Sequence, residues 1–493
     1  MKIYNKLNNS LILNRSSSYA VEQTKSNSFK LMLKAGKKIA RQICSNYKKR
    51  KTLIICGVGG NGGDGFITAK ELLNKNWEID LVIIGNQSNI KGDSLKALNE
   101  LKVTPLKFED INLNEIELFV DALFGLGLSR NIDKETSKLL STIDKHNAPI
   151  VAIDIPSGVD SNTGEILGYA AYCELVITFT SLKYGHILLP GYEKYKKIKV
   201  ENIGITKSAL KKISPKININ NKNYWTKDIK WPKMNDHKYS RGFSLVVGGP
   251  KNMTGAARLA AQSAQRTGSG IVCLAAEKDA EQIYFITLTS QIVKSYKNIE
   301  DFKTIIDDTR IDSILIGPGL SENKNSVLKI KSILETNKSV VLDAGAISCF
   351  RGKINTLKKI ISGKKVVITP HEGELKAIMP ELKGNLIDKA LKASTKLNCI
   401  VVLKGATTII AGPDNKALVN PAGAKWLSTA GSGDVLAGII CGLLSNKMEI
   451  FKASAFGVWL HSEIGNYLGP GLVAEDLPIN INKVYKNLLK TIN

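Results

Sequence analysis

The chain has 493 residues, of which 43% are hydrophobic and 23% are charged. These values argue against intrinsic disorder and predict two or three globular domains, because the chain is too long for one ordinary core. The formal net charge is +25, but Lys and Arg are scattered along the chain rather than gathered into one run. We therefore interpret the charge as a basic surface that attracts small anions, and we expect no nucleic-acid partner.

The seven cysteines are widely spaced and several lie in apolar runs, which is typical of buried thiols in a reducing compartment. The longest apolar run, residues 435–444, is about half of the roughly 20 residues that a membrane span needs. We therefore expect a cytoplasmic protein with no membrane partner. One feature is instead loosely typical of an organelle transit peptide, because residues 1–21 contain no acidic residue and Arg15 precedes a run of three serines.

A capped amphipathic helix is the first predicted element, because residues 29–43 carry apolar side chains at helical spacing behind residues 26–28. Alternating strand-like and helix-like stretches follow, and they predict a Rossmann-like, doubly wound parallel sheet. Ligands of such sheets bind at the carboxyl ends of the strands. The predicted strands are 53–56, 81–84, 118–120, 150–153 and 175–179, with helical stretches such as 67–73 between several of them.

The periodic pattern dissolves between about Lys207 and Ser240, and a second α/β series follows. We predict an α/β protein of two domains: a first domain at 1–212, a linker and the start of the second at 213–240, and the second domain as a whole at 225–493. The strands predicted in the second series are 244–247, 271–275, 313–316, 340–342, 366–368 and 400–403, with helices such as 255–267 and 434–444.

A glycine-rich loop, residues 57–65, follows the first predicted strand and can turn backbone amides onto an anion above a helix N-terminus. Residues 57–62 match the dinucleotide fingerprint G-x-G-x-x-G, but the second strand is followed by Gly85 and Asn86 where that fingerprint expects an acid. This disfavours an ordinary dehydrogenase. A plain surface turn would explain the glycines but not the embedded Asn61 and Asp64.

Polar residues also follow two other predicted strands. Asp121 ends one apolar strand, and Asp154 and Ser157 follow another. Each aspartate alone is as compatible with a structural cap as with a site residue. Three such strand ends in one domain favour a site, because α/β folds collect their site residues there.

These three segments resemble the NAD(P)HX epimerase family over about residues 20–205. The resemblance implies that the glycine loop, the 125–131 loop and one aspartate bind a hydrated dinucleotide, although Gly60 replaces an asparagine of the family. It also implies a K+ site at Asn61, Asp121 and Ser157, whose oxygen atoms suit a hard cation. The substrate-binding residues so implied are Gly60, Asn61, Gly62, Gly63, Asp64, Gly125, Leu126, Gly127, Leu128, Ser129, Arg130, Asn131 and Asp154.

Interconversion of the R and S hydrates at nicotinamide C6 requires proton transfer around a hydroxyl group. Asp154 is our first candidate for this transfer. Lys183 is a weaker candidate, because a lone lysine near a strand end is more often solvated surface.

A small-residue turn, residues 429–433, leads directly into the predicted helix that begins at Asp434. For an isolated turn of this kind, an aspartate that merely caps the helix would be the commoner interpretation. The turn nevertheless resembles the anion hole of the ribokinase-like superfamily, an α/β/α fold. That resemblance implies that the glycines stabilise a transferring phosphoryl group while Asp434 accepts a proton.

Within that superfamily, the motifs at 248–256, 317–319, 369–374, 404–408 and 420–423 resemble the ADP/ATP-dependent NAD(P)HX dehydratase over about residues 225–480. His371 without its motif could equally be a satisfied core histidine, and we interpret His461 as packing. The resemblance implies that the substrate binds Ala256, Gly319, His371 and Asp434, and that the nucleotide binds Lys404, Gly405, Ala406, Thr407, Thr408 and Gly433.

Three positions depart from the dehydratase motifs: Gly345 stands for an aspartate, Glu372 for a proline, and Lys425 lies where an Asn-Pro-x-Met motif is altered. These changes put the local loop shape in question but leave Asp434 and its glycines intact.

Together the resemblances imply a two-domain repair enzyme that epimerises NADHX and NADPHX and dehydrates the S form with ADP or ATP and Mg2+. We expect ADP to be preferred and the chain to form a homo-oligomer. An alternative is a ribokinase-superfamily small-molecule kinase fused to a non-catalytic binding domain, which a released phosphorylated product would reveal.

Overall fold

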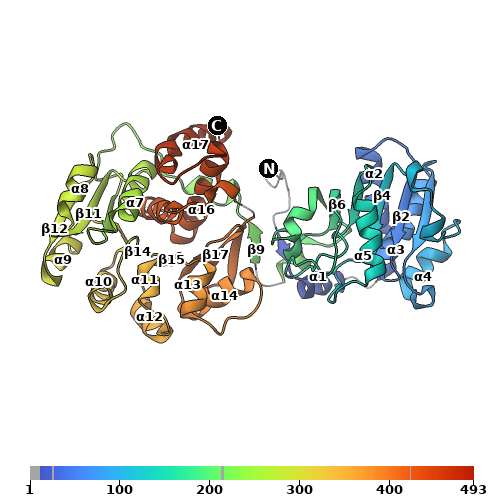
Figure 1. Cartoon of the computed structure of the whole chain (residues 1–493), viewed down its shortest axis with the longest axis horizontal. Coiled ribbons are helices and arrows are strands. Elements are labelled where there is room, and N and C mark those ends of the chain that lie inside the picture. Colours follow the sequence, from blue (N-terminus) through green and yellow to red (C-terminus); the bar gives the residue numbers. More distant parts are fainter. Residues whose placement is uncertain (1–10, 25–26, 213–215, 422, 493) are drawn as a thin grey trace. The chain divides into compact units, whose positions relative to one another are not determined.

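The computed structural model describes residues 11–24, 27–212, 216–421 and 423–492. The chain divides into two compact units, Met1–Asn218 and Ile219–Asn493. Each unit is built around one largely parallel β-sheet with helices packed on it (Figure 1). This architecture confirms the predicted α/β class with doubly wound sheets.

Unit 1 contains a six-stranded sheet in which every pairing is parallel, in the order β3-β2-β4-β5-β6-β8. Parallel strands need crossover connections, which the intervening helices supply. The strands are β2 (Thr52–Cys56), β3 (Ile79–Ile83), β4 (Leu118–Ala122), β5 (Ile150–Ile153), β6 (Cys173–Phe179) and β8 (Tyr195–Glu201).

Helices cover both faces of this sheet. α2 (Ser28–Asn46), α3 (Gly60–Leu73) and α4 (Gly92–Asn99) pack on the face that carries Ile54, while α5 (Lys134–Asp144) packs on the face that carries Leu53. Successive strand side chains point to opposite faces, so strands buried on both sides are continuously apolar.

Two elements precede the helix that we predicted to open the domain. β1 (Ile12–Leu13) pairs in parallel with β7 (Leu182–Lys183), and α1 (Arg15–Glu22) follows it. The prediction that α2 is the first element is therefore wrong. Residues 1–10 of the transit-like pattern lie outside the described residues, whereas residues 11–21 are part of the folded unit.

Unit 2 contains a ten-stranded sheet in the order β12-β11-β10-β13-β14-β15-β16-β17-β18-β9. The pairings from β12 to β16 are parallel, and β17 pairs antiparallel with both β16 and β18. The strands are β9 (Lys216–Ile219), β10 (Phe243–Val247), β11 (Ile271–Glu277), β12 (Ile292–Tyr296), β13 (Ser313–Ile316), β14 (Ser339–Leu342), β15 (Val366–Ile368), β16 (Ile400–Leu403), β17 (Thr408–Gly412) and β18 (Lys416–Asn420).

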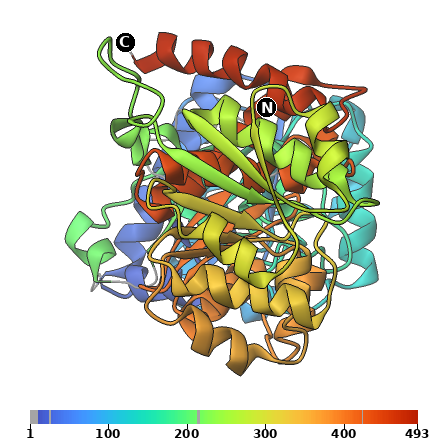
Figure 2. The same cartoon turned by 90° about the vertical axis from the view of Figure 1, so that its left-hand side faces the viewer.

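This sheet lies between two helical layers (Figure 2). One layer contains α7 (Thr254–Thr267), α15 (Ser432–Ser445), α16 (Ile450–Leu468) and α17 (Asp476–Ile492), and its apolar side chains form one core with the strands. The other α-helices in the described part of the chain are α6 (Lys207–Lys211), α8 (Glu281–Thr287), α9 (Ile299–Ile306), α10 (Lys324–Glu335), α11 (Gly345–Ser348), α12 (Ile354–Ile361), α13 (Glu372–Ile378) and α14 (Leu386–Leu397).

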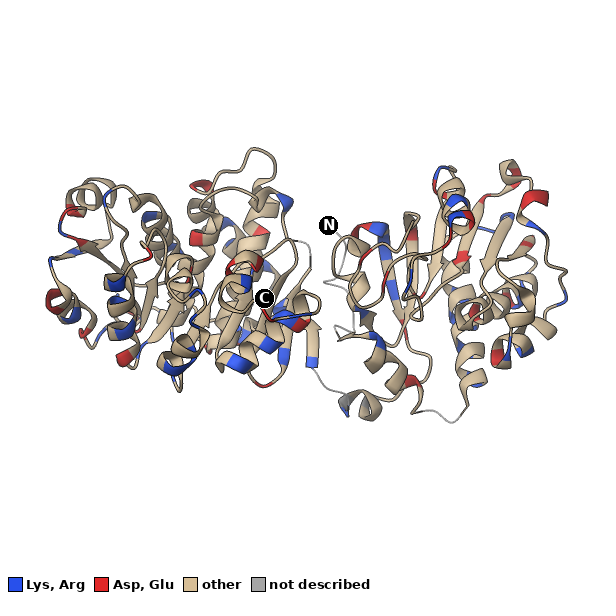
Figure 3. Cartoon of the chain, turned by 60° about the horizontal axis from the view of Figure 1, so that its bottom comes forward, with Lys and Arg blue, Asp and Glu red and all other residues tan. Residues whose placement is uncertain are grey.

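Lysine and arginine positions are distributed over helices and loops of both units, with acidic positions among them (Figure 3). This distribution agrees with a dispersed basic surface rather than one concentrated patch. Within the described part of the chain, no helix is both long enough and apolar enough to span a bilayer.

Candidate active sites

A cavity of about 990 Å³ lies in unit 1. It opens where β2, β4 and β5 end, which is the edge of the sheet at which a parallel α/β fold binds ligands. The predicted substrate-binding residues that line it are Gly60, Asn61, Asp64, Gly125, Leu126, Gly127, Leu128, Ser129, Arg130 and Asp154. The other predicted residues of this set, Gly62, Gly63 and Asn131, are not among its lining residues.

The glycine loop combines open and closely packed positions. A β-carbon on Gly60 would meet no atom within 4 Å, whereas one on Gly62 would lie 1.8 Å from the carbonyl oxygen of Gly57. Gly62 therefore allows the turn between β2 and α3 to close, and Gly60 leaves space at the cavity wall. α3 begins here without a side-chain cap, so its first amide groups remain available to an anion.

Asp154 forms a buried ion pair with Lys183. The Lys183 Nζ atom donates to Asp154 Oδ1 at 2.6 Å, to Thr178 Oγ1 at 2.7 Å and to the Phe179 carbonyl oxygen at 3.1 Å. Lys183 is 1% exposed, so our expectation that it is a solvated surface lysine is wrong. The sequence alone could not reveal this, because the pairing depends on how β7 returns to the end of β5.

The backbone and the charge of Asp154 are both held in place. Its φ is 63°, a left-handed conformation that is uncommon for a residue with a side chain, and His186 Nε2 donates to its carbonyl oxygen at 2.8 Å. Burial by itself would raise the pKa of Asp154, but the Lys183 charge and hydrogen bonds outweigh burial and lower it. Asp154 is therefore ionised at neutral pH.

Asp121 and Ser157 join the segments that follow β4 and β5. Asp121 accepts hydrogen bonds from the Ser157 backbone N–H at 2.8 Å and from Ser157 Oγ at 2.5 Å. Ser157 Oγ also accepts from the Phe124 N–H at 2.9 Å. Burial raises the pKa of Asp121, and the Ser157 hydrogen bonds oppose that rise.

Asn61 lies beside the same turn, because a β-carbon on Gly125 would be 3.2 Å from Asn61 Oδ1. The Asn61 amide nitrogen is buried and has no hydrogen-bond partner. A buried amide group with an unsatisfied atom is costly unless a ligand completes its surroundings.

Several cavity residues were missed by the sequence analysis, among them Tyr19, Glu22 and Gln23. The first two lie on α1 and the third caps that helix. Nothing in an eight-residue polar helix distinguishes a cavity wall from a solvated segment, so no sequence signal identified them.

In unit 2, Asp434 lies in the first turn of α15. The residue before that helix, Gly431, has a φ of 88°, a conformation that only glycine adopts readily, and it provides no side-chain cap. The free amides and the helix dipole therefore favour an anion beside Asp434.

Lys404 connects this turn to a buried aspartate at the end of β14. Its Nζ atom donates to Asp343 Oδ1 at 2.6 Å, and Thr369 Oγ1 donates to the same oxygen at 2.7 Å. A β-carbon on Gly433 would lie 3.4 Å from Lys404 Nζ, so the ammonium group is adjacent to the glycine turn. Asp343 was not predicted as a site residue, although it follows an apolar strand as Asp121 and Asp154 do.

The surroundings of Asp434 favour its protonated form. Burial contributes most, the Asp343 charge adds to it, and the Lys404 charge opposes it, so that the pKa rises to about 6. A carboxyl group with a pKa near neutrality can accept a proton and release it again, which suits a general base.

His371 is not the satisfied core histidine that its sequence position allowed, because 59% of its side chain is exposed. It caps α13, and its Nδ1 atom accepts from the Gly373 N–H at 3.0 Å and the Glu374 N–H at 3.2 Å. Nε2 of the neutral ring therefore carries the proton and can donate to a ligand.

Other predicted residues lie around the same end of the sheet. Gly319 has a φ of 71° and contacts the loop before α7, while Ala256 lies in the first turn of α7. Residues 405–408 form the turn between β16 and β17, where Thr408 Oγ1 donates to the Gly405 carbonyl oxygen at 3.0 Å. His461 is 8% exposed, which agrees with packing, and its pKa is lowered by burial to about 4.

The three departures from the dehydratase motifs have different surroundings. A β-carbon on Gly345 would lie 2.2 Å from the Leu320 carbonyl oxygen, so the backbone is too close for a larger residue without movement. Glu372 pairs with Lys389 at 2.6 Å, and the Lys425 ammonium group lies over the Trp426 ring.

Comparison with known proteins finds relatives for both units. The family model described as the YjeF-related protein N-terminus matches residues 28–185, and the one described as NAD(P)H-hydrate dehydratase matches residues 244–483. A bifunctional NAD(P)H-hydrate repair enzyme Nnr of Dictyoglomus turgidum is 32% identical over 470 residues, which are 89% of this chain and 90% of the relative. The enzyme of the same name from Moorella thermoacetica is 29% identical over 466 residues, 88% of this chain and 87% of the relative.

Among solved structures, an ADP/ATP-dependent NAD(P)H-hydrate dehydratase from Bacillus subtilis, co-crystallized with ATP and Mg2+, is 25% identical. That match covers 55% of this chain and 98% of the other chain, with a TM-score of 0.49. Matches to both units within single relatives do not favour the alternative of a small-molecule kinase joined to a non-catalytic module.

Proposed function

Since this chain belongs to the family of bifunctional NAD(P)H-hydrate repair enzymes, we propose that unit 1 performs the epimerisation and unit 2 the dehydration on the residues described above. The chain repairs NAD(P)HX: it interconverts the R and S hydrates and restores NAD(P)H from the S form. The two sites do different chemistry, so each assignment has its own support and its own test.

The arrangement of Asp434 at the start of α15 beside Lys404 is the observation that supports the dehydratase assignment most strongly. Asp434 accepts the proton of the C6 hydroxyl, and that oxygen attacks the terminal phosphoryl group of the nucleotide. The amides of the 431–433 turn and the Lys404 ammonium group stabilise the charge on the transferring phosphoryl oxygens. The C6–O bond then breaks as phosphate departs, and loss of a ring proton restores the dihydronicotinamide.

ADP is our choice of phosphoryl donor, with ATP as the alternative. A Mg2+ ion would neutralise the nucleotide phosphates, as in other phosphoryl transfers. Lys404, Gly405, Ala406, Thr407, Thr408 and Gly433 would hold the nucleotide. Ala256, Gly319 and His371 would hold the hydrated dinucleotide.

In unit 1, Asp154 is the proposed proton acceptor at C6 because it lines the cavity and Lys183 keeps it ionised there. The glycine loop holds the dinucleotide phosphates and the 125–131 loop covers them. A K+ ion fits the oxygen atoms of Asn61, Asp121 and Ser157, which border one turn, and it would neutralise the buried Asp121 charge there. The unpartnered atom of Asn61 is its amide nitrogen, a donor, so it supports a substrate acceptor atom beside this position and not the cation itself.

Cytoplasmic location and self-association remain proposals, as does the absence of a nucleic-acid or membrane partner. The seven cysteines all lack disulfide bonds, which supports a reducing compartment. The interspersed surface charges give no support to a nucleic-acid interface.

One experiment tests both assignments with the full chain. A mixture of R and S NADHX is supplied with ADP or with ATP, and recovery of the dihydronicotinamide absorbance is followed for the wild type, Asp434→Asn and Asp154→Asn. We expect Asp434→Asn to lose all recovery and Asp154→Asn to stop once the S hydrate is consumed. Full recovery at the wild-type rate in Asp434→Asn would overturn the dehydratase assignment, and rapid consumption of both hydrates in Asp154→Asn would overturn the epimerase assignment.

A further inference from the structure

Helix α1 forms part of the wall of the unit 1 cavity, although the resemblances assign no residue on it. Its last residue, Glu22, lines the cavity together with Asp64 and Asp154. Three carboxyl groups from three different elements therefore share the space in which the proposed substrate binds.

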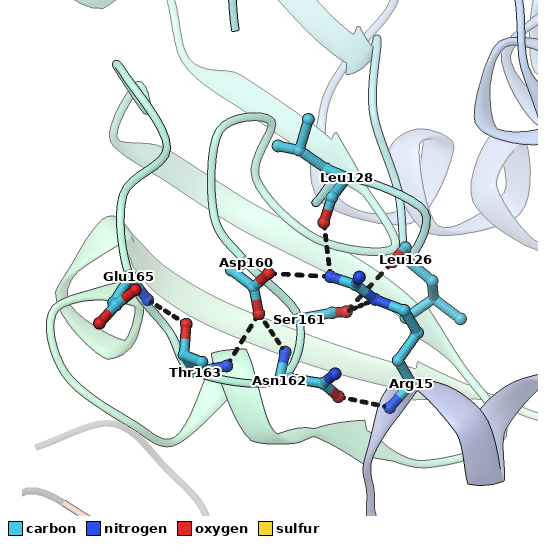
Figure 4. A network of polar contacts seen from close by, with 8 residues as sticks. All are labelled: Arg15, Leu126, Leu128, Asp160, Ser161, Asn162, Thr163 and Glu165. Atoms are coloured by element: carbon cyan, nitrogen blue, oxygen red, sulfur yellow. Dashed lines mark hydrogen bonds and ion pairs between the residues drawn. The ribbon is translucent and has the colours of Figure 1, made fainter. Parts of the chain in front are cut away.

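The other end of α1 is anchored to the same site through Arg15 (Figure 4). The Arg15 Nη2 atom donates to Asp160 Oδ2 at 2.9 Å and to the Leu128 carbonyl oxygen, and Nε donates to Ser161 Oγ at 3.0 Å. The Ser161 hydroxyl in turn donates to the Leu126 carbonyl oxygen at 3.2 Å.

The backbone at the start of α1 is held as well. The Arg15 N–H donates to Asn162 Oδ1 at 2.7 Å, and the Asn14 side chain caps the helix by accepting from the Ser17 N–H. The Arg15 and Asp160 side chains are only 18% and 13% exposed. α1 is therefore fixed to the loop that covers the cavity and to the segment after β5, which holds Glu22 in a defined position.

Charged groups from several elements act on Glu22. The Lys183 charge on β7 lowers the pKa of Glu22, and the Asp154 charge after β5 raises it. The Glu22 charge in turn raises the pKa values of Asp64 on α3 and of Tyr19 on α1. Burial has the largest effect, and the pKa of Glu22 rises to about 7. Glu22 and Asp154 thus have pKa values displaced in opposite directions within one cavity, which is the usual arrangement of an acid and a base.

Epimerisation at C6 requires two such groups. The C6 carbon bears both the hydroxyl and the ring nitrogen, so protonation of the hydroxyl lets it leave as water while the nitrogen lone pair forms a C=N+ bond. Water then adds to the other face of C6, the nitrogen regains its lone pair, and one proton is released to a base. The acid and the base must act from opposite faces of the ring, so one carboxyl group cannot do both in a single turnover.

We propose that Glu22 is the second acid–base group of the epimerase site, donating a proton to the departing hydroxyl while Asp154 accepts one from the incoming water. The reverse reaction exchanges the two roles. This inference rests on the proposed epimerase function.

The test follows conversion of purified R hydrate into S hydrate by chromatography with the full chain and no nucleotide, after subtraction of the spontaneous rate. The variants are Glu22→Gln, Glu22→Asp and a control, Glu109→Gln, which removes an exposed carboxylate that does not line the cavity. We expect Glu22→Gln to lower kcat about 100-fold or more, with KM near the wild-type value. We expect the wild-type rate to fall as pH rises past about 7, and we expect Glu22→Gln to lose this decline and Glu22→Asp to retain it.

The pH profile separates a chemical role from a structural one. A Glu22→Gln variant that keeps the wild-type decline above neutrality would overturn the proposal, whatever its rate. The proposal would also be overturned if the decline in rate above neutral pH disappeared in Asp64→Asn but persisted in Glu22→Gln. An unchanged urea-unfolding transition of unit 1 verifies that each variant is folded, because dehydration of the S hydrate reports only on unit 2. A wild-type chain that does not accelerate epimerisation would refute the proposed function itself.

Discussion

Replacement of Lys183 by methionine tests the charge pair at the centre of unit 1. Methionine keeps an unbranched side chain in a site where Lys183 is 1% exposed, so packing changes little and the main effect is loss of the ammonium group. Asp154, which is 6% exposed, then becomes a buried carboxylate without its cation, and the Phe179 carbonyl oxygen loses a donor at 3.1 Å. Removal of one partner of a buried ion pair typically costs about 3–5 kcal/mol, and we expect a loss of this size at neutral pH.

The loss should depend on pH in a defined direction. In the wild type the folded-state pKa of Asp154 is lowered, so the pair stabilises the fold above the unfolded-state pKa of roughly 3.9 and ceases to do so as pH falls. In Lys183→Met, burial without the cation raises that folded-state pKa, so the destabilisation appears only at a pH high enough to ionise Asp154. The difference in unfolding free energy is therefore largest near neutral pH and shrinks as the solution is acidified.

Urea unfolding of the full chain at several pH values measures this difference from the transition of unit 1. Lys102→Met, which removes an exposed lysine of the same unit, serves as the matched control and should change the unfolding free energy by less than about 0.5 kcal/mol. Lys183→Met should also lose epimerisation while retaining dehydration of the S hydrate. A destabilisation that is the same at acidic and neutral pH would refute the reasoning, because it would come from packing rather than charge.

Three further predictions concern other features of the two sites. The dehydration rate of the wild type should rise as pH increases through about 6, because Asp434 must be ionised to accept a proton. A rate that does not change across this pH range would contradict the role of Asp434 as a base. In thermal unfolding, Gly60→Ala should leave the stability unchanged or raise it by up to about 1 kcal/mol, because the new β-carbon would meet no atom within 4 Å. Gly62→Ala should destabilise the fold, because the new β-carbon would lie 1.8 Å from the Gly57 carbonyl oxygen. Arg15→Lys should raise KM for the hydrate about tenfold in epimerisation and leave dehydration unchanged. The reason is that an ammonium group cannot make all the hydrogen bonds that the guanidinium group makes in different directions. An unchanged KM would mean that the 125–131 loop holds its position without Arg15.

The sequence allowed the fold class to be predicted because the central strands are apolar runs separated by helical stretches. Asp121 and Asp154 lie at the ends of β4 and β5. Ligands bind at the carboxyl edge of a parallel sheet whatever the order of its strands, so both aspartates could be predicted as site residues without knowledge of the strand order. Several strands were missed, among them β12, a short strand at the edge of the sheet that carries polar residues and shows weak alternation.

The unpredicted parts of the sites depend on contacts between residues distant in the sequence. Lys183 resembles any surface lysine until β7 and β1 pair and bring it beneath Asp154. Glu22 and Arg15 lie on an eight-residue helix whose own pattern carries no signal of burial, and their roles arise from the loops that the helix contacts. Local periodicity reports which face of an element is apolar, but not which charges meet across a cavity.

The contrast between Gly60 and Gly345 has a consequence for protein engineering. The motif resemblances imply a polar side chain at both positions, so an engineer who follows those motifs would place asparagine at residue 60 and aspartate at residue 345. The first substitution would enter an empty volume at the wall of the cavity, but the second would force the Leu320 carbonyl group, 2.2 Å from the new β-carbon, to move. Introduction of a side chain is therefore sterically easy at residue 60, whereas at residue 345 the neighbouring loop would have to be redesigned with it.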